Sequence, residues 1–135
     1  MNRMSNERVF PNSPRAVADA RRYALETVGE VEPDVADAVA VMVSELATNC
    51  IRHAATQFAM TVDRTPHEIR VAVTDSGSGH PAVRSPALTD RSGRGLQIVQ
   101  AFADDWGVSL AEATPGKTVW FTVSLVEPLS DVPRG

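Results

Sequence analysis

The hydrophobic period of this chain changes near Gln57, and that change constrains the fold more than any other feature. Over residues 33–54 apolar side chains recur with a period near 3.6, the spacing of one face of a helix. After Gln57 they alternate with polar or small residues, first over 58–62 and again over 69–73, and Thr65-Pro66-His67 interrupts the alternation. The pattern predicts a long, largely buried helix followed by a β-hairpin.

The remaining segments supply further helices and strands. The predicted helices run from Pro14 to about Val28, with Asn12 or Ser13 as the cap and Gly29 as the stop, and from about Gly93 or Arg94 to Ala103. Further strands are predicted over 8–10, near 106–112 and over 119–125. Residues 76–92 are rich in Gly, Ser and Pro and have no period, which predicts a long loop. The order β-α-α-β-β-loop-α-β-β predicts an α+β fold, a two-layer sandwich whose mixed, mostly antiparallel sheet carries three helices on one face.

Size and composition favour one compact domain. With 135 residues we expect one folded domain over residues 8–126, between a flexible N-terminus (1–7) and a flexible tail (127–135). The net charge of −4 argues against nucleic acid as a partner. One cysteine allows no internal disulfide, and neither a signal sequence nor a membrane-spanning run is visible, so we expect a soluble cytoplasmic protein.

The long helix carries polar residues at intervals of four on an otherwise apolar segment. Glu45, Asn49 and His53 share one of its faces. A carboxylate and an amide are costly to bury there without partners, and a cleft with a metal ion would supply them. Glu45 is then a candidate general base and Asn49 a candidate Mg²⁺ ligand. The alternative is the solvated stripe of an amphipathic helix, and Cys50 fits a small core residue.

The segment Asp75-Ser76-Gly77-Ser78-Gly79 directly follows the second strand of the predicted hairpin. A carboxylate at a strand end can accept a hydrogen bond from the exocyclic amine of a base. Glycines let the backbone approach a flat base or a phosphate. The alternative is an ordinary Asp/Gly/Ser turn.

A glycine-rich sequence, Arg91-Ser92-Gly93-Arg94-Gly95-Leu96, opens the third predicted helix. The free amides and positive dipole end of a helix attract phosphate, and Arg91 or Arg94 could add charged donors. The segment is neither a Walker A loop nor a dinucleotide fingerprint, because the Lys-Ser/Thr of the first and the third glycine of the second are missing.

In this order, the three motifs resemble those of the GHKL ATPase superfamily with its Bergerat nucleotide fold, to which gyrase and histidine kinases belong. The likeness covers Phe10 to Leu125. It implies a histidine kinase-like ATP-binding domain with ATP and Mg²⁺ as cofactors.

The resemblance also implies roles for single residues. Glu45 and Asn49 look like the catalytic base and the Mg²⁺ ligand of the family's N box, and Arg52 or His53 would approach the phosphates. The further implied nucleotide-binding residues are Asp75 at the adenine amine, Gly77 and Gly79 around the base, Arg91, Gly93, Arg94, Gly95 and Leu96 at the phosphates, and a pocket threonine, Thr118 in preference to Thr122.

Within the superfamily the chain is most similar to the bacterial anti-sigma factor serine/threonine kinases (RsbW-like), through Glu45-Leu46-Ala47-Thr48-Asn49 and residues 91–96. That likeness implies a protein kinase that phosphorylates a serine of a STAS-domain anti-anti-sigma partner, regulates the availability of a sigma factor and forms a homodimer. Two alternatives stay open: an ATP-binding regulatory module without kinase activity, and a stand-alone histidine kinase catalytic domain.

Overall fold

The elements follow one another in the predicted order in the computed structural model, which describes residues 6–53, 57–75, 91–110 and 116–125. They are β1 (Asn6–Phe10), α1 (Arg15–Val28), α2 (Pro33–His53), β2 (Phe58–Arg64), β3 (Glu68–Asp75), α4 (Arg91–Phe102), β4 (Asp105–Leu110) and β5 (Lys117–Ser124). Among these residues no helix is long and apolar enough to cross a membrane.

The strands form one sheet in the order β1-β2-β3-β5-β4. Every pairing between the described strands is antiparallel, so the sheet is antiparallel throughout them rather than mixed. A tight turn joins β2 to β3, and the Thr65 hydroxyl accepts hydrogen bonds from the backbone N–H groups of His67 and Glu68. The hairpin that the alternating pattern predicts is therefore confirmed.

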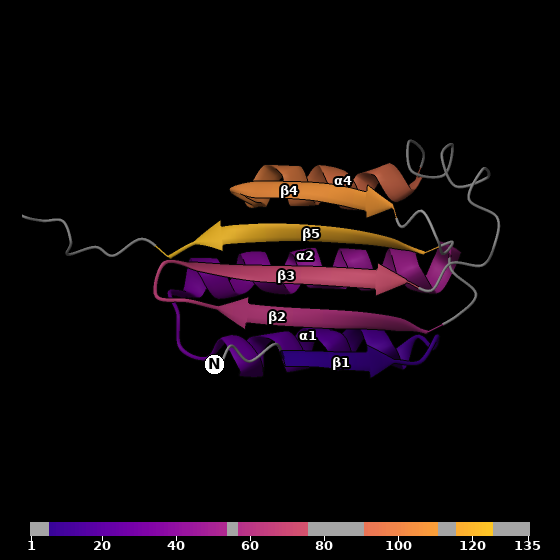
Figure 1. The fold of residues 1–135 in the computed structure, drawn as a ribbon, viewed down its shortest axis with the longest axis horizontal. Coiled ribbons are helices and arrows are strands. Elements are labelled where there is room, and N and C mark those ends of the chain that lie inside the picture. The colour runs from indigo at the N-terminus through magenta and orange to yellow at the C-terminus, as the bar shows by residue number, and fades with distance from the viewer. Residues whose placement is uncertain (1–5, 54–56, 76–90, 111–115, 126–135) are drawn as a thin grey trace, which may run out of the picture.

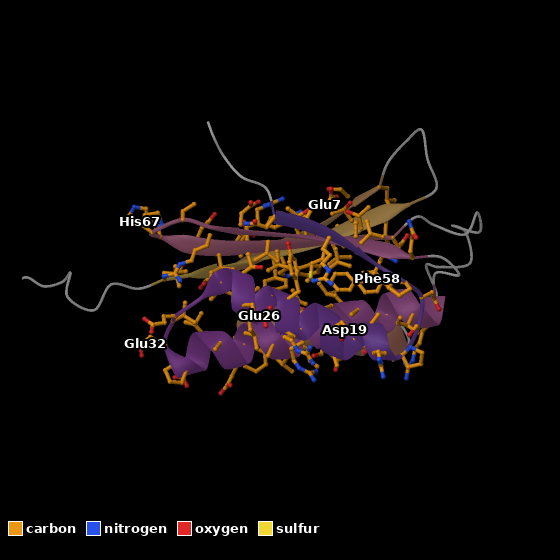
Figure 2. All side chains as sticks on the ribbon, turned by 90° about the horizontal axis from the view of Figure 1, so that it is seen from below. Glu7, Asp19, Glu26, Glu32, Phe58 and His67 are labelled. Atoms are coloured by element: carbon orange, nitrogen blue, oxygen red, sulfur yellow. The ribbon has the colours of Figure 1, made fainter. Side chains whose placement is uncertain are left out.

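The helices form a second layer on one face of the sheet, and Figure 2 shows the two layers edge-on. Most strand residues that face the helices are apolar and buried, as in the β3 series Ile69, Val71 and Val73. The long helix α2 contributes Val39, Met42 and other apolar residues, and it packs against both α1 and α4. The α+β two-layer sandwich is confirmed.

Two helix ends differ from or refine the prediction. The cap of α1 is Pro14, which makes no side-chain hydrogen bond, so neither Asn12 nor Ser13 takes the predicted capping role. At the other end Gly29 has φ 79°, a conformation that favours glycine, and its N–H bonds to the Leu25 carbonyl. The Arg64 guanidinium donates to the carbonyl of Val28 at 2.6 Å and to that of Glu30 at 2.9 Å, which ties this end to β2.

The antiparallel order brings the segments with chemical motifs to one end of the molecule. In Figure 1 the end of β3, the start of β5, the C-terminal end of α2 and the start of α4 all lie at the right. The β2–β3 turn lies at the opposite end. The motifs that are far apart in the sequence therefore meet where β3 ends.

Candidate functional site

Asp75 occupies the last position of β3 and faces the helix layer. It continues the buried series Ile69, Val71 and Val73, because every second residue of a strand points to the same face. The register places Lys117, the first residue of β5, directly opposite Asp75. Their side chains form an ion pair of 3.5 Å between Nζ and Oδ2, and they are 9% exposed for Asp75 and 17% for Lys117. Asp75, which sequence analysis assigns to the adenine amine, is thus buried and ion-paired.

Cys50 of α2 lies close to this ion pair. Burial and, to a lesser extent, the nearby Asp75 carboxylate raise the pKa of its thiol to about 12, and Lys117 partly offsets that increase. The thiol is therefore neutral at physiological pH and fits the core role expected for it. Because Cys50 directly follows Asn49, its position also shows that the end of α2 approaches the end of β3.

Glu45 and Asn49 lie one helical turn apart on α2, and both are half-buried. Their neighbours Leu46, Ala47 and Cys50 point into the core. Within the described part of the chain, neither Glu45 nor Asn49 has a hydrogen-bonding or ion-pair partner. Two half-buried polar groups without protein partners fit a ligand-binding flank better than a fully solvated stripe.

The flank with Glu45 and Asn49 is turned away from α1. Arg21 of α1 donates to the Ser44 hydroxyl at 2.9 Å, so Ser44 marks the side of α2 that faces α1. At 3.6 residues per turn, Glu45 lies about 100° and Asn49 about 140° from Ser44 around the helix. Between this flank and Ser44, the surface of α2 carries the exposed Arg52, so the flank lies across the solvent side of the helix from α1. Because α2 packs against α4 as well as against α1, the flank points toward α4.

The donor atoms on this flank suit a magnesium ion. Mg²⁺ prefers hard oxygen ligands, and in phosphate-transfer sites it takes one or two from the protein and the rest from phosphate and water. The half-buried side-chain oxygens of Asn49 and Glu45 could supply that small share. No cluster of three or more His, Cys, Asp or Glu side chains that could hold a metal occurs among the described residues.

The other predicted nucleotide contacts are described in part. Gly77 and Gly79 lie outside the described residues, as do the side chains of His53 and of residues 91–96. The helix backbone of Arg91, Gly93, Arg94, Gly95 and Leu96 is described, and it forms the first two turns of α4. The helix therefore starts earlier than the predicted Gly93, and its N-terminal end lies at the same end of the molecule as Asp75 (Figure 1).

Neither predicted threonine is brought to Asp75. Thr118 lies opposite Thr74 and shares a hydrogen bond of 2.7 Å with its hydroxyl, on the sheet face turned away from the helices. Thr122 lies further along β5, opposite Arg70. Lys117 occupies the position beside Asp75 instead. The alternation of Val119, Phe121 and Val123 could have indicated this, since Lys117 has the same parity and the two threonines have the opposite one.

Comparison with known families agrees with this geometry. No curated protein matches the chain. Residues 10–123 match the family model described as histidine kinase-like ATPase domain, and this match runs from the last residue of β1 to the next-to-last residue of β5. The GHKL-type resemblance of the sequence is thereby confirmed at the level of the family. With the match spanning most of the chain and the motif-bearing segments gathered at one end of the sheet, the protein belongs to the histidine kinase-like ATPase domain family, which indicates that it binds ATP.

Proposed function

We propose that this protein is an anti-sigma factor serine kinase that uses ATP to phosphorylate a serine of a STAS-domain anti-anti-sigma protein and so regulates the availability of a sigma factor. The observation that supports this function best is that Cys50, the neighbour of Asn49 in α2, lies close to the Asp75–Lys117 ion pair. This proximity supports the proposal because the candidate metal ligand Asn49 directly precedes Cys50, and the candidate base Glu45 lies about one helical turn earlier on α2. The proposal takes its substrate class from the resemblance of Glu45-Leu46-Ala47-Thr48-Asn49 and residues 91–96 to such kinases.

In this proposal the chain's own groups bind and orient the nucleotide. The Asp75 carboxylate accepts a hydrogen bond from the adenine amine, and the backbone amides at the start of α4 face the phosphates. Asn49 would hold Mg²⁺, which would neutralise charge on the phosphate oxygens. The residues that would hold ATP are therefore Asp75 of β3 for the base, and Asn49 of α2 with the start of α4 for the phosphates.

Glu45 carries out the proton transfer. The serine oxygen of the partner forms a bond to the γ-phosphorus, the bond between that phosphorus and the bridging oxygen breaks, and ADP leaves. Glu45 accepts the proton that the serine hydroxyl loses. Its half-buried position and its lack of a partner among the described residues leave the carboxylate available for this role.

Two measurements test this function separately. Calorimetric titration of Mg-ATP should show binding to the wild type, and Asp75→Asn should weaken it at least about tenfold because a hydrogen bond to a charged group is lost. Incubation with ATP and a STAS partner should then yield phosphoserine by mass spectrometry. Glu45→Gln should lower the transfer rate by about 10²- to 10⁴-fold with ATP affinity retained.

Glu26→Gln is the matched control, because Glu26 is an exposed carboxylate of α1 on the helix layer (Figure 2). It should change neither measurement. If ATP binds to the wild type but no STAS protein is ever phosphorylated, the kinase reading fails and a nucleotide-regulated binding module remains. A Glu45→Gln variant that transfers phosphate at the wild-type rate would remove Glu45 from the mechanism.

A further inference from the structure

The pairing of Lys117 with Asp75 places a cation where sequence analysis expected a threonine. The two residues are direct partners in the β3–β5 ladder, and both point to the helix side of the sheet. Lys117 is the one lysine of the chain. Its ammonium is therefore held at the end of β3, next to the carboxylate that would read the base.

This ion pair is incomplete as it stands. Its 3.5 Å separation is longer than the roughly 2.7–2.9 Å of a tight charge-assisted hydrogen bond. An ammonium has three N–H donors and a carboxylate about four lone-pair sites, and within the described residues each group has the other as its partner. Buried charges are stable when additional hydrogen bonds satisfy the remaining donors and acceptors. The pair therefore keeps unused donors and acceptors, which a ligand that offers one donor and one acceptor side by side would satisfy.

The Watson–Crick edge of adenine has that pattern. Its exocyclic amine is a donor, and the ring nitrogen N1 beside it is an acceptor. A carboxylate and an ammonium a few ångströms apart complement the two groups in one plane, whereas a carboxylate alone complements the amine and leaves N1 without a partner.

We propose that Lys117 is a second base-reading residue, whose ammonium donates a hydrogen bond to N1 of adenine while Asp75 accepts one from the exocyclic amine. This inference rests on the proposed ATP site. Cys50 of α2, which lies near the same pair, cannot take this role because its neutral thiol is a weak donor and is buried. Thr118 points to the other face of the sheet.

The test compares ATP with 1-deaza-ATP, in which N1 is replaced by a C–H group, and with 7-deaza-ATP, which keeps N1. The wild type should bind 1-deaza-ATP about 10- to 100-fold more weakly than ATP, the fold-change of one hydrogen bond to a charged group. It should bind 7-deaza-ATP about as well as ATP. In Lys117→Met the affinities for ATP and 1-deaza-ATP should lie within about twofold of each other, because the ammonium that donates to N1 is gone.

Arg70→Met is the matched control. Arg70 is also a strand cation, but it lies over the Trp120 ring at 4.5 Å on the opposite face of the sheet. This variant should keep the full preference for ATP over 1-deaza-ATP. Circular dichroism shows whether each variant is folded, since Lys117→Met leaves a buried carboxylate without its partner.

The outcomes separate this inference from the proposed function. If the wild type binds no ATP, or Asp75→Asn binds it as well as the wild type does, the ATP site itself fails. If ATP binds and depends on Asp75 but the wild type does not discriminate against 1-deaza-ATP, N1 receives no hydrogen bond and the role of Lys117 is refuted. That result needs no folded variant. If Lys117→Met still binds ATP more tightly than 1-deaza-ATP, another group donates the hydrogen bond to N1, and Lys117 acts only as a counter-ion of Asp75.

Discussion

Gly107 of β4 is held at glycine by the indole ring of Trp120. The two residues are opposite each other in the β4–β5 ladder. A Cβ atom added to Gly107 would lie 2.8 Å from three atoms of the ring, which is inside van der Waals contact. The Arg70 guanidinium covers the ring 4.5 Å from its centroid, so the ring cannot move without loosening that contact. We therefore expect Gly107→Ala to destabilise the fold.

The size of the effect follows from opposing contributions. Overpacking costs about 1–3 kcal/mol, and displacement of the ring gives up a cation–π contact of about 0.5–1 kcal/mol. Replacing glycine by alanine inside a strand returns about 0.5–1 kcal/mol. The free energy of unfolding should fall by about 2 kcal/mol, which lowers the melting temperature by roughly 6–10 °C for a domain of this size.

Urea unfolding, followed by far-UV circular dichroism, measures this loss. In a Trp120→Leu background the same Gly107→Ala change should cost less than about 0.5 kcal/mol, because the ring that causes the clash is absent. A single variant within about 0.5 kcal/mol of the wild type would refute the reasoning. So would a loss that is equally large in both backgrounds, since it could not then come from Trp120.

Two further predictions concern pH and a helix end. Mainly through burial, the pKa of Cys50 rises from 9.0 to about 12 in the folded chain, so the thiol of the unfolded chain loses its proton first as the pH rises. The free energy of unfolding should therefore keep its full value below about pH 9. From there toward pH 12 it should fall by about 1.4 kcal/mol per pH unit. Cys50→Ala should remove that part of the slope in urea unfolding at several pH values, and an unchanged slope would contradict the assignment. Arg64→Ala should lower the free energy of unfolding by about 1–2 kcal/mol, because the guanidinium no longer bonds the carbonyls at the end of α1. Arg22→Ala, on the exposed side of α1, should change stability by less than about 0.5 kcal/mol, and equal losses in the two variants would rule out the capping role of Arg64.

Periodicity predicted most of the fold, because it directly reflects which face of an element is buried. The alternation over 58–62 and 69–73 gave the β2–β3 hairpin, and the 3.6 period gave α2 to within a residue or two. The predicted N-cap of α1 was wrong, because Asn12 and Ser13 are residue types that favour the cap position, whereas the helix has Pro14 at that position. The sheet was predicted to be mixed and mostly antiparallel, and the mixed part was wrong, because the relative direction of paired strands depends on contacts between distant segments that no local pattern encodes.

The candidate site shows the same division. Glu45, Asn49 and Asp75 could be proposed from spacing on one helix and from a strand end, and the structure places the end of α2 beside Asp75. The partner of Asp75 could not be found in this way, because it depends on the register between β3 and β5. Sequence analysis considered Thr118 and Thr122, which point to the same face of β5, and it did not consider Lys117. The alternation along β5 already separates the residues of the two sheet faces.

The β3–β5 ladder also has a consequence for the order of folding. The β2–β3 hairpin is local and can close early, whereas β5 must pair with β3 across residues 76–90, α4 and β4. Asp75 therefore stays without Lys117 until the last strand of the chain has docked. A nucleotide that requires both residues would bind the completed fold and none of its precursors, so its binding free energy would add in full to the stability of the native state.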